Sequence, residues 1–489
     1  MMMNNRPSFC LFYCAHFLCS KDCNPRVVCG LSKQMIFKLL LLIAAAFCSS
    51  ATLSAKTPAK PNVILILVDD FGFECITANG GVSYKTPNFD RLATTGMRFE
   101  NCHVQPLCTP TRVQLMTGQY NVRNYVEFGF LPTNSRTFAH LFRDAGYATA
   151  VAGKWQLGQD MSLPKHFGFD EHCLWQLTRK IERYKNPGLE INGKEINYTK
   201  DEYGPDLVNN YALDFITRHK DKPFLLYYPM ILTHDPFVPT PNSPDYAKAV
   251  KKNDKYFADM VAYADQLTGK IISKLDELKL RENTLIILVG DNGTHSAITS
   301  QFRGKEYRGG KGQKTGNGTH VPLIVNLPKS IPAGVVKADL VDSTDFLPTI
   351  CEAAGIKIPK KMVMDGQSFW PQLQGKTGSP REWSYCWYAP RNQTVKFEYA
   401  QDLKFKLYRD GAFVEKISDH EERALTEKLS AEAKRSRANL AKVLEKYSDA
   451  RSAEVAAQKG PDAVSPGNDE SNPGNKKGAN RKESKAQAN

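Results

Sequence analysis

The sequence predicts an α/β fold in which a mostly parallel sheet lies between helices. Three unbroken apolar runs of strand length, at 61–68, 223–229 and 284–289, are rich in large aliphatic and aromatic residues. Unbroken runs of this kind indicate strands that are buried on both faces, as in parallel sheets. Residues 254–278 place apolar side chains every three to four positions, which predicts an amphipathic helix packed on that sheet.

Turn residues and local periodicity place the other elements ahead of residue 376. We expect helices at 87–98, 113–116, 137–145 and 343–355, and a strand at 323–326. Residues 146–158 indicate a strand that runs into a Gly-Lys-Trp turn, and 172–205 an irregular polar segment. Gly96, Gly146 and Gly355 stand where these helices should end, and glycine is a common residue at such positions.

The carboxyl-terminal part combines short strands with one long helix. We expect strands at 383–388, 395–399, 404–408 and 412–415, then a helix at 421–447 with Leu425, Leu429, Leu440 and Leu444 facing inward. This order predicts a small α+β subdomain, an antiparallel sheet covered by a helix. After Asp449 the chain loses its aromatic and large aliphatic residues, which is typical of a disordered tail.

Composition indicates a globular protein with a basic surface. The 489 residues are 42% hydrophobic and 24% charged, with a net charge of +14. This charge suits polyanionic partners, although an ordinary solvated basic surface explains it equally well. No nucleic-acid recognition module or basic–aromatic repeat is present, so we expect no nucleic-acid partner.

Residues 35–55 have the pattern of a secretory signal peptide. A short apolar run follows Lys33 and Lys38 and ends in small residues, too short for a stable membrane span. We expect translation to begin at Met35 and the product to be secreted or periplasmic. A lipoprotein anchored at Cys48 is the less favoured alternative, because Phe47 is a poor residue before a lipidated cysteine.

Two adjacent carboxylates, Asp69 and Asp70, follow the first buried run directly. Open α/β sheets bind ligands at the carboxyl ends of their strands, and hard divalent cations prefer oxygen ligands. The pair therefore indicates either a cation site or a solvated turn.

The segment Cys108-Thr109-Pro110-Thr111-Arg112 resembles the Cys-x-Pro-x-Arg signature of type I (formylglycine-dependent) sulfatases. In that family a maturation enzyme oxidises the cysteine to formylglycine, whose hydrate is the nucleophile. Six cysteines follow residue 55, so conversion of Cys108 would leave five, which excludes a fully paired disulfide framework. A helix starting just after Cys108 would favour negative charge there.

Further motifs of the same family follow in order. Residues 146–158 resemble Gly-Tyr-x-Thr-x-x-x-Gly-Lys-Trp-His-Leu-Gly, with Lys154 on the sulfate-holding lysine and Gln156 in place of histidine. Thr-His-Asp-Pro at 233–236 is similar to the strand-linked Thr-His-x-Pro motif. Gly-Asp-Asn-Gly at 290–293 resembles the Ser-Asp-Asn-Gly metal segment. Residues 308–312 are similar to Arg-x-Gly-Lys-Gly and align Lys311 with the second sulfate-binding lysine, whereas Gly316, Asn317 and His320 depart from the residues that follow in the family.

The resemblance spans about 61–447 and includes the family's Asp-Gly-x-Ser segment at 365–368. It implies an alkaline-phosphatase-like fold: a signal-peptide region at 1–55, a catalytic domain at 56–375, a small subdomain at 376–448 and a tail at 449–489. It also implies a sulfate monoester hydrolase acting on sulfated carbohydrates or aryl sulfates. One calcium ion would be held by Asp69, Asp70, Asp291 and Asn292, with the residue derived from Cys108 beside it.

The resemblance implies a role for each remaining site residue. Lys154 and Lys311 would hold sulfate oxygens, Arg112 would steady the nucleophile, and His234 would donate a proton to the departing alcohol. Gln156 can form hydrogen bonds but cannot take a proton near neutral pH, so either another base serves or turnover is impaired.

Two other functions remain open on the sequence alone. A phosphomonoester or phosphonate hydrolase of the same superfamily would share the fold, but two-metal phosphatases need further carboxylate and histidine ligands that we cannot place. A non-catalytic binder of sulfated glycans would use the same metal and lysines without turnover.

Overall fold

The computed structural model describes residues 60–248, 251–390 and 395–458, all within one compact unit that begins at Lys60. Its strands are β1 (Asn62–Val68), β2 (Met97–His103), β3 (Ala148–Lys154), β4 (Glu171–Trp175), β5 (Gly188–Ile191), β6 (Lys194–Asn197), β7 (Phe224–Pro229), β8 (Thr284–Gly290), β9 (Thr299–Phe302), β10 (Lys305–Arg308), β11 (His320–Asn326), β12 (Val335–Asp342), β13 (Ser384–Tyr388), β14 (Phe397–Gln401), β15 (Phe405–Tyr408), β16 (Phe413–Lys416) and β17 (Glu422–Ala424).

The α-helices are α2 (Pro87–Thr94), α3 (Cys108–Thr117), α4 (Asn121–Asn124), α5 (Phe138–Asp144), α6 (Leu163–His166), α7 (Gly204–Arg218), α8 (Phe257–Glu277), α9 (Gly316–Thr319), α10 (Phe346–Ala353), α11 (Trp370–Leu373), α12 (Ala431–Lys446) and α13 (Ala453–Ala457).

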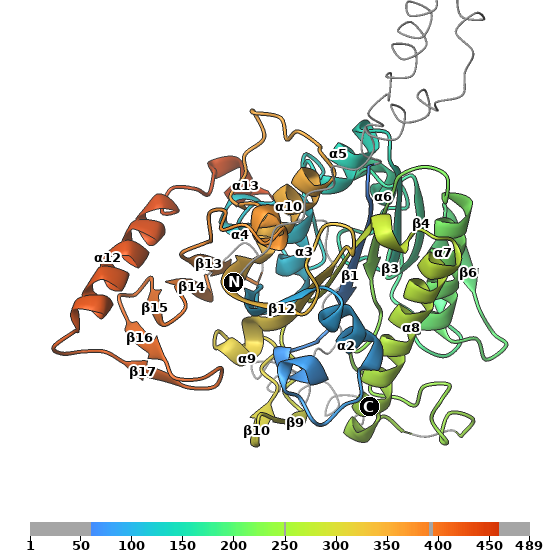
Figure 1. Cartoon of the computed structure of the whole chain (residues 1–489), viewed down its shortest axis with the longest axis horizontal. Coiled ribbons are helices and arrows are strands. Elements are labelled where there is room, and N and C mark those ends of the chain that lie inside the picture. The colour runs from blue at the N-terminus through green and yellow to red at the C-terminus, as the bar shows by residue number, and fades with distance from the viewer. Residues whose placement is uncertain (1–59, 249–250, 391–394, 459–489) are drawn as a thin grey trace, which may run out of the picture. The chain divides into compact units, whose positions relative to one another are not determined.

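A mixed sheet forms the centre of this unit (Figure 1). Among the described residues it has ten strands in the order β12-β2-β11-β8-β1-β7-β3-β4-β5-β6. The five central strands β8, β1, β7, β3 and β4 are mutually parallel, whereas β11, β5 and β6 run antiparallel to their neighbours. The predicted mostly parallel α/β core is therefore confirmed.

Helices cover both faces of the sheet because its central strands are apolar on both sides. Val63, Leu65 and Leu67 of β1 pack in a core cluster shared with α3, α5 and α10. The alternate residues of β1, including Ile64 and Ile66, pack in a second cluster shared with α2, α7 and α8. Strand β1 thus lies at the middle of a three-layer arrangement, and its carboxyl end is enclosed from both sides.

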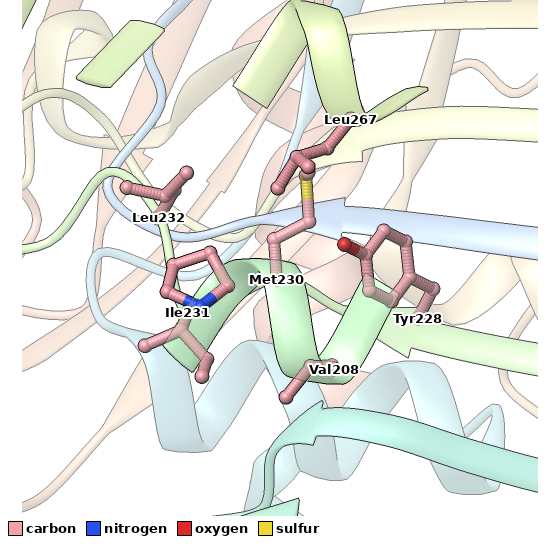
Figure 2. A pocket seen from close by; sticks show the side chains of 7 residues that line it. Val208, Tyr228, Met230, Ile231, Leu232 and Leu267 are labelled. Carbon is pink, nitrogen blue, oxygen red and sulfur yellow. The ribbon is translucent and has the colours of Figure 1, made fainter. Parts of the chain in front are cut away.

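Apolar side chains pack around a small pocket beside the chain that follows β7 (Figure 2). It lies between α7, α8 and the residues that follow β7, and it is lined by Pro205, Val208, Tyr228, Met230, Ile231, Leu232 and Leu267. It has no room for a water molecule. The packing anchors the segment 230–232, which leads directly into Thr233 and His234.

The carboxyl-terminal subdomain contains, within the described residues, a five-stranded sheet in the order β13-β14-β15-β16-β17, with its neighbouring strands antiparallel. Helix α12 contacts β14 and β15 and buries Leu440 and Leu444. The buried side chain of Arg381 ties this part to the main unit: its Nε donates to Asp345 at 2.8 Å and its Nη1 donates to the Tyr120 hydroxyl at 2.9 Å.

Several predicted elements need correction. Residues 172–205 are not irregular, because they contain most of β4 and all of β5 and β6. The helix expected at 87–98 ends at Thr94, and β2 begins at Met97. Residues 422–424 form β17, so the helix expected at 421–447 begins only at Ala431 and leaves Leu425 and Leu429 outside it.

The signal-peptide prediction at 35–55 lies outside the described residues, as does most of the predicted tail. Within that tail, residues 453–457 form α13. In the described ranges we find no helix that is both long enough and apolar enough to cross a membrane.

Candidate active site

The carboxyl ends of four parallel strands bring the predicted site residues together. Asp69 follows β1, Asp291 follows β8, Lys154 ends β3, and His234 lies five residues after β7. The loop after β7 is bound to the end of β1, since Asp69 N donates to Leu232 O at 2.9 Å and Thr233 N donates to Asp69 O at 2.8 Å. This is the edge at which open α/β sheets bind ligands.

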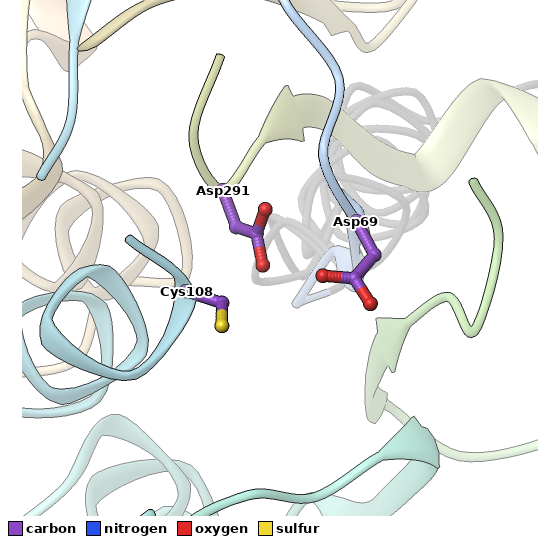
Figure 3. A group of neighbouring side chains, drawn as sticks. All are labelled: Asp69, Cys108 and Asp291. Carbon is purple, nitrogen blue, oxygen red and sulfur yellow. The ribbon is translucent and has the colours of Figure 1, made fainter. Parts of the chain in front are cut away.

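Cys108 lies in the first turn of α3 and faces two carboxylates (Figure 3). Ligand atoms of Cys108, Asp69 and Asp291 all lie within 4.8 Å of one another. The helix expected at 113–116 in fact begins at Cys108, so the side chain sits at the positive end of the helix dipole. Burial nevertheless raises the pKa of the Cys108 thiol to about 11. An unmodified thiol here is therefore protonated and a poor nucleophile at neutral pH.

Each buried carboxylate of the site is paired with a buried cation. Lys154 Nζ donates to both oxygens of Asp69, at 3.0 and 2.9 Å. Lys311 Nζ donates to Asp70 Oδ2 at 3.0 Å. Arg112 Nη2 donates to Asp291 Oδ2 at 2.8 Å, and its Nη1 donates to the carbonyl oxygen of Lys154 at 3.2 Å.

These ion pairs leave one carboxylate poorly compensated. Burial and the neighbouring charge of Asp69 raise the pKa of Asp291 to about 7. Burial acts on Asp69 in the same direction, but Lys154, His234 and Arg112 hold the Asp69 pKa below its usual value. An additional cation between the two would stabilise both charges.

Asp70 and Asn292 complete the polar cluster. Asn292 Nδ2 donates to Asp70 Oδ1 at 2.8 Å, and the backbone amide of Asp70 donates to Asp291 Oδ1 at 3.0 Å. Asn292 Oδ1 is buried and accepts a hydrogen bond from no described residue. Asp70 also has a φ of 56°, a conformation that costs a non-glycine residue free energy and is often retained at functional sites.

His234 is held in one tautomer beside Lys311. Its Nδ1 lies 2.7 Å from the backbone oxygen of Asp235, which can only accept, so Nδ1 carries the hydrogen. Nε2 then accepts from Lys311 Nζ at 3.0 Å. Burial and the charge of Lys311 lower the pKa of His234, which favours the neutral ring in the substrate-free site.

A second group of metal-type ligands adjoins the first. Ligand atoms of Asp70, His234 and Asp235 lie within 4.8 Å of one another. Lys311 Nζ, however, lies 3.0 Å from both Asp70 Oδ2 and His234 Nε2. An ammonium group therefore already contacts two of these three potential metal ligands.

An open pocket of about 420 Å³ lies next to His234. Its lining comes from the loop after β7, the residues that lead into α8, the loop after β8 and the end of β10: Asp235, Phe237, Lys252, Asn253, Asp254, His295, Ser296, Ala297 and Arg308. The rings of Phe237 and His295 contact edge to face, with centroids 5.5 Å apart. The lining is thus partly aromatic, with charged groups of both signs.

The part of the chain that contains the site matches a known family model, which establishes the family. Residues 61–356 match the model described as Sulfatase, and residues 315–429 match N-sulphoglucosamine sulphohydrolase, C-terminal. The chain belongs to the sulfatase family. Its curated relatives include arylsulfatase A of Bos taurus, at 31% identity over 71% of this chain and 73% of that protein.

Two further relatives extend this result. N-acetylgalactosamine-6-sulfatase of Canis lupus familiaris is 29% identical over 69% of this chain and 70% of its own length. The crystal structure of Ps i-CgsB in complex with k-i-k-neocarrahexaose aligns with a TM-score of 0.67 and 25% identity, covering 82% of this chain and 95% of that one. The protein is thus a sulfatase, a hydrolase of sulfuric esters, with the alkaline-phosphatase-like fold.

One residue beside the site is buried although the sequence did not indicate it. Arg183 stands in a basic cluster with Arg179, Lys180 and Lys185, for which the sequence favours a solvated loop over an anionic substrate rim. In the structure its side chain is buried and Nη1 lies 4.0 Å from Asp69 Oδ2. No local pattern distinguishes it from Arg179, which pairs instead with Glu190 at 2.9 Å.

The segment that departs from the family pattern is bound to the small subdomain. Asn317 N donates to the backbone oxygen of Asp419 at 2.8 Å, and His320 Nδ1 lies 2.9 Å from Asp419 Oδ2. His320 therefore serves a structural contact in this sulfatase. Gln156 lies just beyond Lys154 with a φ of 57°, and its buried Oε1 has no hydrogen-bond partner among the described residues.

Proposed function

We propose that this sulfatase hydrolyses sulfate esters of carbohydrates with one calcium ion and a formylglycine derived from Cys108. The convergence of Cys108 with Asp69 and Asp291 carries this proposal, because it joins the modifiable cysteine to a buried pair of oxygen ligands. A formylglycine-generating maturation enzyme would then be an obligatory partner. The signal-peptide pattern at 35–55 supports secretion or periplasmic export.

The residues present fit a calcium ion. Asp69, Asp70, Asp291 and Asn292 offer only oxygen donors, which suit this cation. The unpartnered Asn292 Oδ1 and the raised pKa of Asp291 are both features that a bound cation would relieve. Bound calcium would supply Lewis-acid polarisation of a sulfate oxygen, and the oxidised Cys108 would supply the nucleophilic oxygen.

The chain's own cations would bind the sulfate group. Lys154 and Lys311 are fully buried and extend to the two sides of the carboxylate cluster, on Asp69 and Asp70 respectively. Fixed positive charges in a water-poor site stabilise an anionic sulfate strongly, because few competing dipoles remain. Arg112, bound to Asp291 and to the Lys154 carbonyl, would fix the position of both groups.

His234 would protonate the departing oxygen. Nδ1 is committed to the Asp235 carbonyl, so Nε2 is the atom available for proton transfer. Nε2 accepts from Lys311 in the substrate-free site, so it would first take up a proton and then deliver it to the departing oxygen. Its contact with Lys311 places it at the sulfate-binding lysine, where the bridging oxygen of a sulfate ester would leave. The lowered pKa makes the protonated ring a stronger acid once it forms.

The pocket beside Asp235 would hold the leaving group. Its volume of about 420 Å³ and mixed polar and aromatic lining suit a sugar better than a purely apolar alcohol. The k-i-k-neocarrahexaose bound in the related structure and the N-acetylgalactosamine-6-sulfatase relative support the same substrate class. Aryl sulfates would enter as smaller surrogates, consistent with the arylsulfatase relative.

Mass spectrometry across Cys108 tests the proposal. Protein made with a formylglycine-generating enzyme should carry an aldehyde in the peptide containing Cys108. With calcium it should release sulfate from a panel of sulfated sugars. An unmodified thiol together with no turnover on any sulfated sugar or aryl sulfate would refute it.

Replacing Gln156 by histidine should raise kcat by about tenfold, because an imidazole supplies the acid–base group that an amide lacks. Histidine tolerates the left-handed backbone at this position. Gln176 offers a matched control, since it also follows a tryptophan and has a φ of 63°. Steady-state kinetics should show a gain for Q156H and none for Q176H. An unchanged kcat in Q156H would mean that another group already performs this step.

A further inference from the structure

The guanidinium of Arg183 is buried, and the described residues do not satisfy all of its hydrogen-bond donors. Arg183 is 8% exposed, and its guanidinium stacks on the ring of Trp175 at 3.9 Å from the centroid. Nη1 has no hydrogen-bond partner among the described residues. A buried donor left without a partner is costly, so it calls for a partner that the described residues do not supply, such as an ordered water, an ion or a ligand.

The position of Arg183 is fixed from three sides. Trp175 Nε1 donates to the carbonyl oxygen of Ile181 at 2.8 Å, which sets the ring under the guanidinium. The next residue, Tyr184, donates its hydroxyl hydrogen to the backbone oxygen of His234. Gly204 N donates to Tyr184 O at 2.7 Å. The guanidinium is therefore held in place before any ligand arrives.

Asp69 is not a hydrogen-bond partner of Arg183. Its two oxygens already accept from Lys154 Nζ at 3.0 and 2.9 Å, whereas Arg183 Nη1 stays 4.0 Å from Oδ2. Arg183 and Lys154 thus converge on the same carboxylate oxygen, and only the lysine bonds to it. Arg183 therefore supplies a positive charge that forms no hydrogen bond to Asp69 and lies where Lys154 would bind the substrate.

We propose that Arg183 is a substrate-binding residue that holds an oxygen of the substrate's sulfate group alongside Lys154. This inference rests on the proposed role of Lys154 in the same site. A guanidinium offers several donors in a fixed plane and suits an oxyanion. Because the sulfate carries its charge in the ground state as well as in the transition state, the contact strengthens binding more than it accelerates the chemical step.

The expected result is a loss of sulfate affinity in Arg183→Met. Loss of one charged hydrogen bond predicts a rise of about 10-fold to 100-fold in KM for 4-nitrophenyl sulfate and in Ki for inorganic sulfate, with kcat within about threefold. Arg183→Lys keeps the charge without the planar fork and should lose about threefold to tenfold. Lys185→Met removes the same charge two residues away, where the side chain is 43% exposed and pairs with Asp201, and should change neither constant.

Calorimetric titration of inorganic sulfate into the calcium-loaded, unmatured protein gives a second readout that needs no turnover. The affinity should fall in R183M by the same factor as Ki rises. Thermal unfolding shows whether R183M folds, and R183K carries the test if it does not.

Two results would overturn the inference: an unchanged sulfate affinity in folded R183M or, where only R183K folds, in R183K, or a raised KM confined to substrates with a second acidic group. The latter would assign Arg183 to the leaving group. Absence of turnover by the wild type would count against the proposed function instead, because sulfate binding to the unmatured protein is measured separately.

Discussion

Replacing Cys108 by alanine is expected to lower kcat by about four to six orders of magnitude, the scale seen when a covalent nucleophile is removed. The side chain is fully buried at the start of α3, with ligand atoms of Asp69 and Asp291 within 4.8 Å of its sulfur. Alanine keeps the backbone and the helix but leaves no atom to oxidise. The measurement is sulfate release at saturating calcium from a protein whose unfolding temperature matches the wild type.

Cys351 supplies the control for this variant. It is equally buried and also lies on a helix, α10, but it packs in the apolar core. Cys351→Ala should therefore keep kcat within about threefold while losing some stability. Activity of C108A within about tenfold of the wild type would place the nucleophile on another residue.

Replacing Asp291 by asparagine is expected to weaken calcium binding by at least about 100-fold. Loss of a residue that merely supports a ligand already costs about 10-fold to 100-fold, so loss of a ligand carboxylate should cost more. Asparagine preserves the shape but has a single acceptor oxygen. It can accept from Arg112, which donates to Asp291 Oδ2 at 2.8 Å, or from the Asp70 amide, which donates to Oδ1 at 3.0 Å, but not from both. The variant therefore loses the negative charge and one hydrogen bond.

Thermal unfolding with and without calcium measures this effect apart from activity. Calcium at 100 times its Kd should stabilise the wild type by about 2.7 kcal/mol, and D291N should lose most of that gain. Asp265→Asn is the matched control: this buried carboxylate accepts from the backbone amides of Asn88 and Phe89, away from the site. D265N should keep the calcium response, and an equal response in D291N would remove Asp291 from the ligand set.

The sequence predicted the central strands and the convergence of the carboxylates for one physical reason. Unbroken apolar runs indicate double-sided burial, and parallel strands must place their carboxyl ends at one edge. Strand β2 escaped detection because it alternates buried residues with Arg98 and Glu100. Strands β5 and β6 are four residues each and lie at the sheet edge, where polar side chains are tolerated and give no periodic signal.

The sequence could not predict which cation pairs with which carboxylate in the site, for a different physical reason. Lys154, Lys311 and Arg112 were expected from their motifs, but their partners depend on how β1, β3 and β8 are spaced in three dimensions. Arg183 is the sharpest case, since its burial depends on Trp175 and on the loop that carries His234. Neither Trp175 nor the His234 loop shares a recognisable sequence motif with Arg183.

If Cys108 is oxidised as proposed, its burial has a consequence for biosynthesis. The side chain is 1% exposed, and every residue from Cys108 to Thr117 is buried in α3. A maturation enzyme would need access to this thiol, which the folded chain does not offer. Oxidation would then have to precede folding. A molecule that folded first would keep an inert thiol, so the active fraction would reflect a kinetic competition between the two processes.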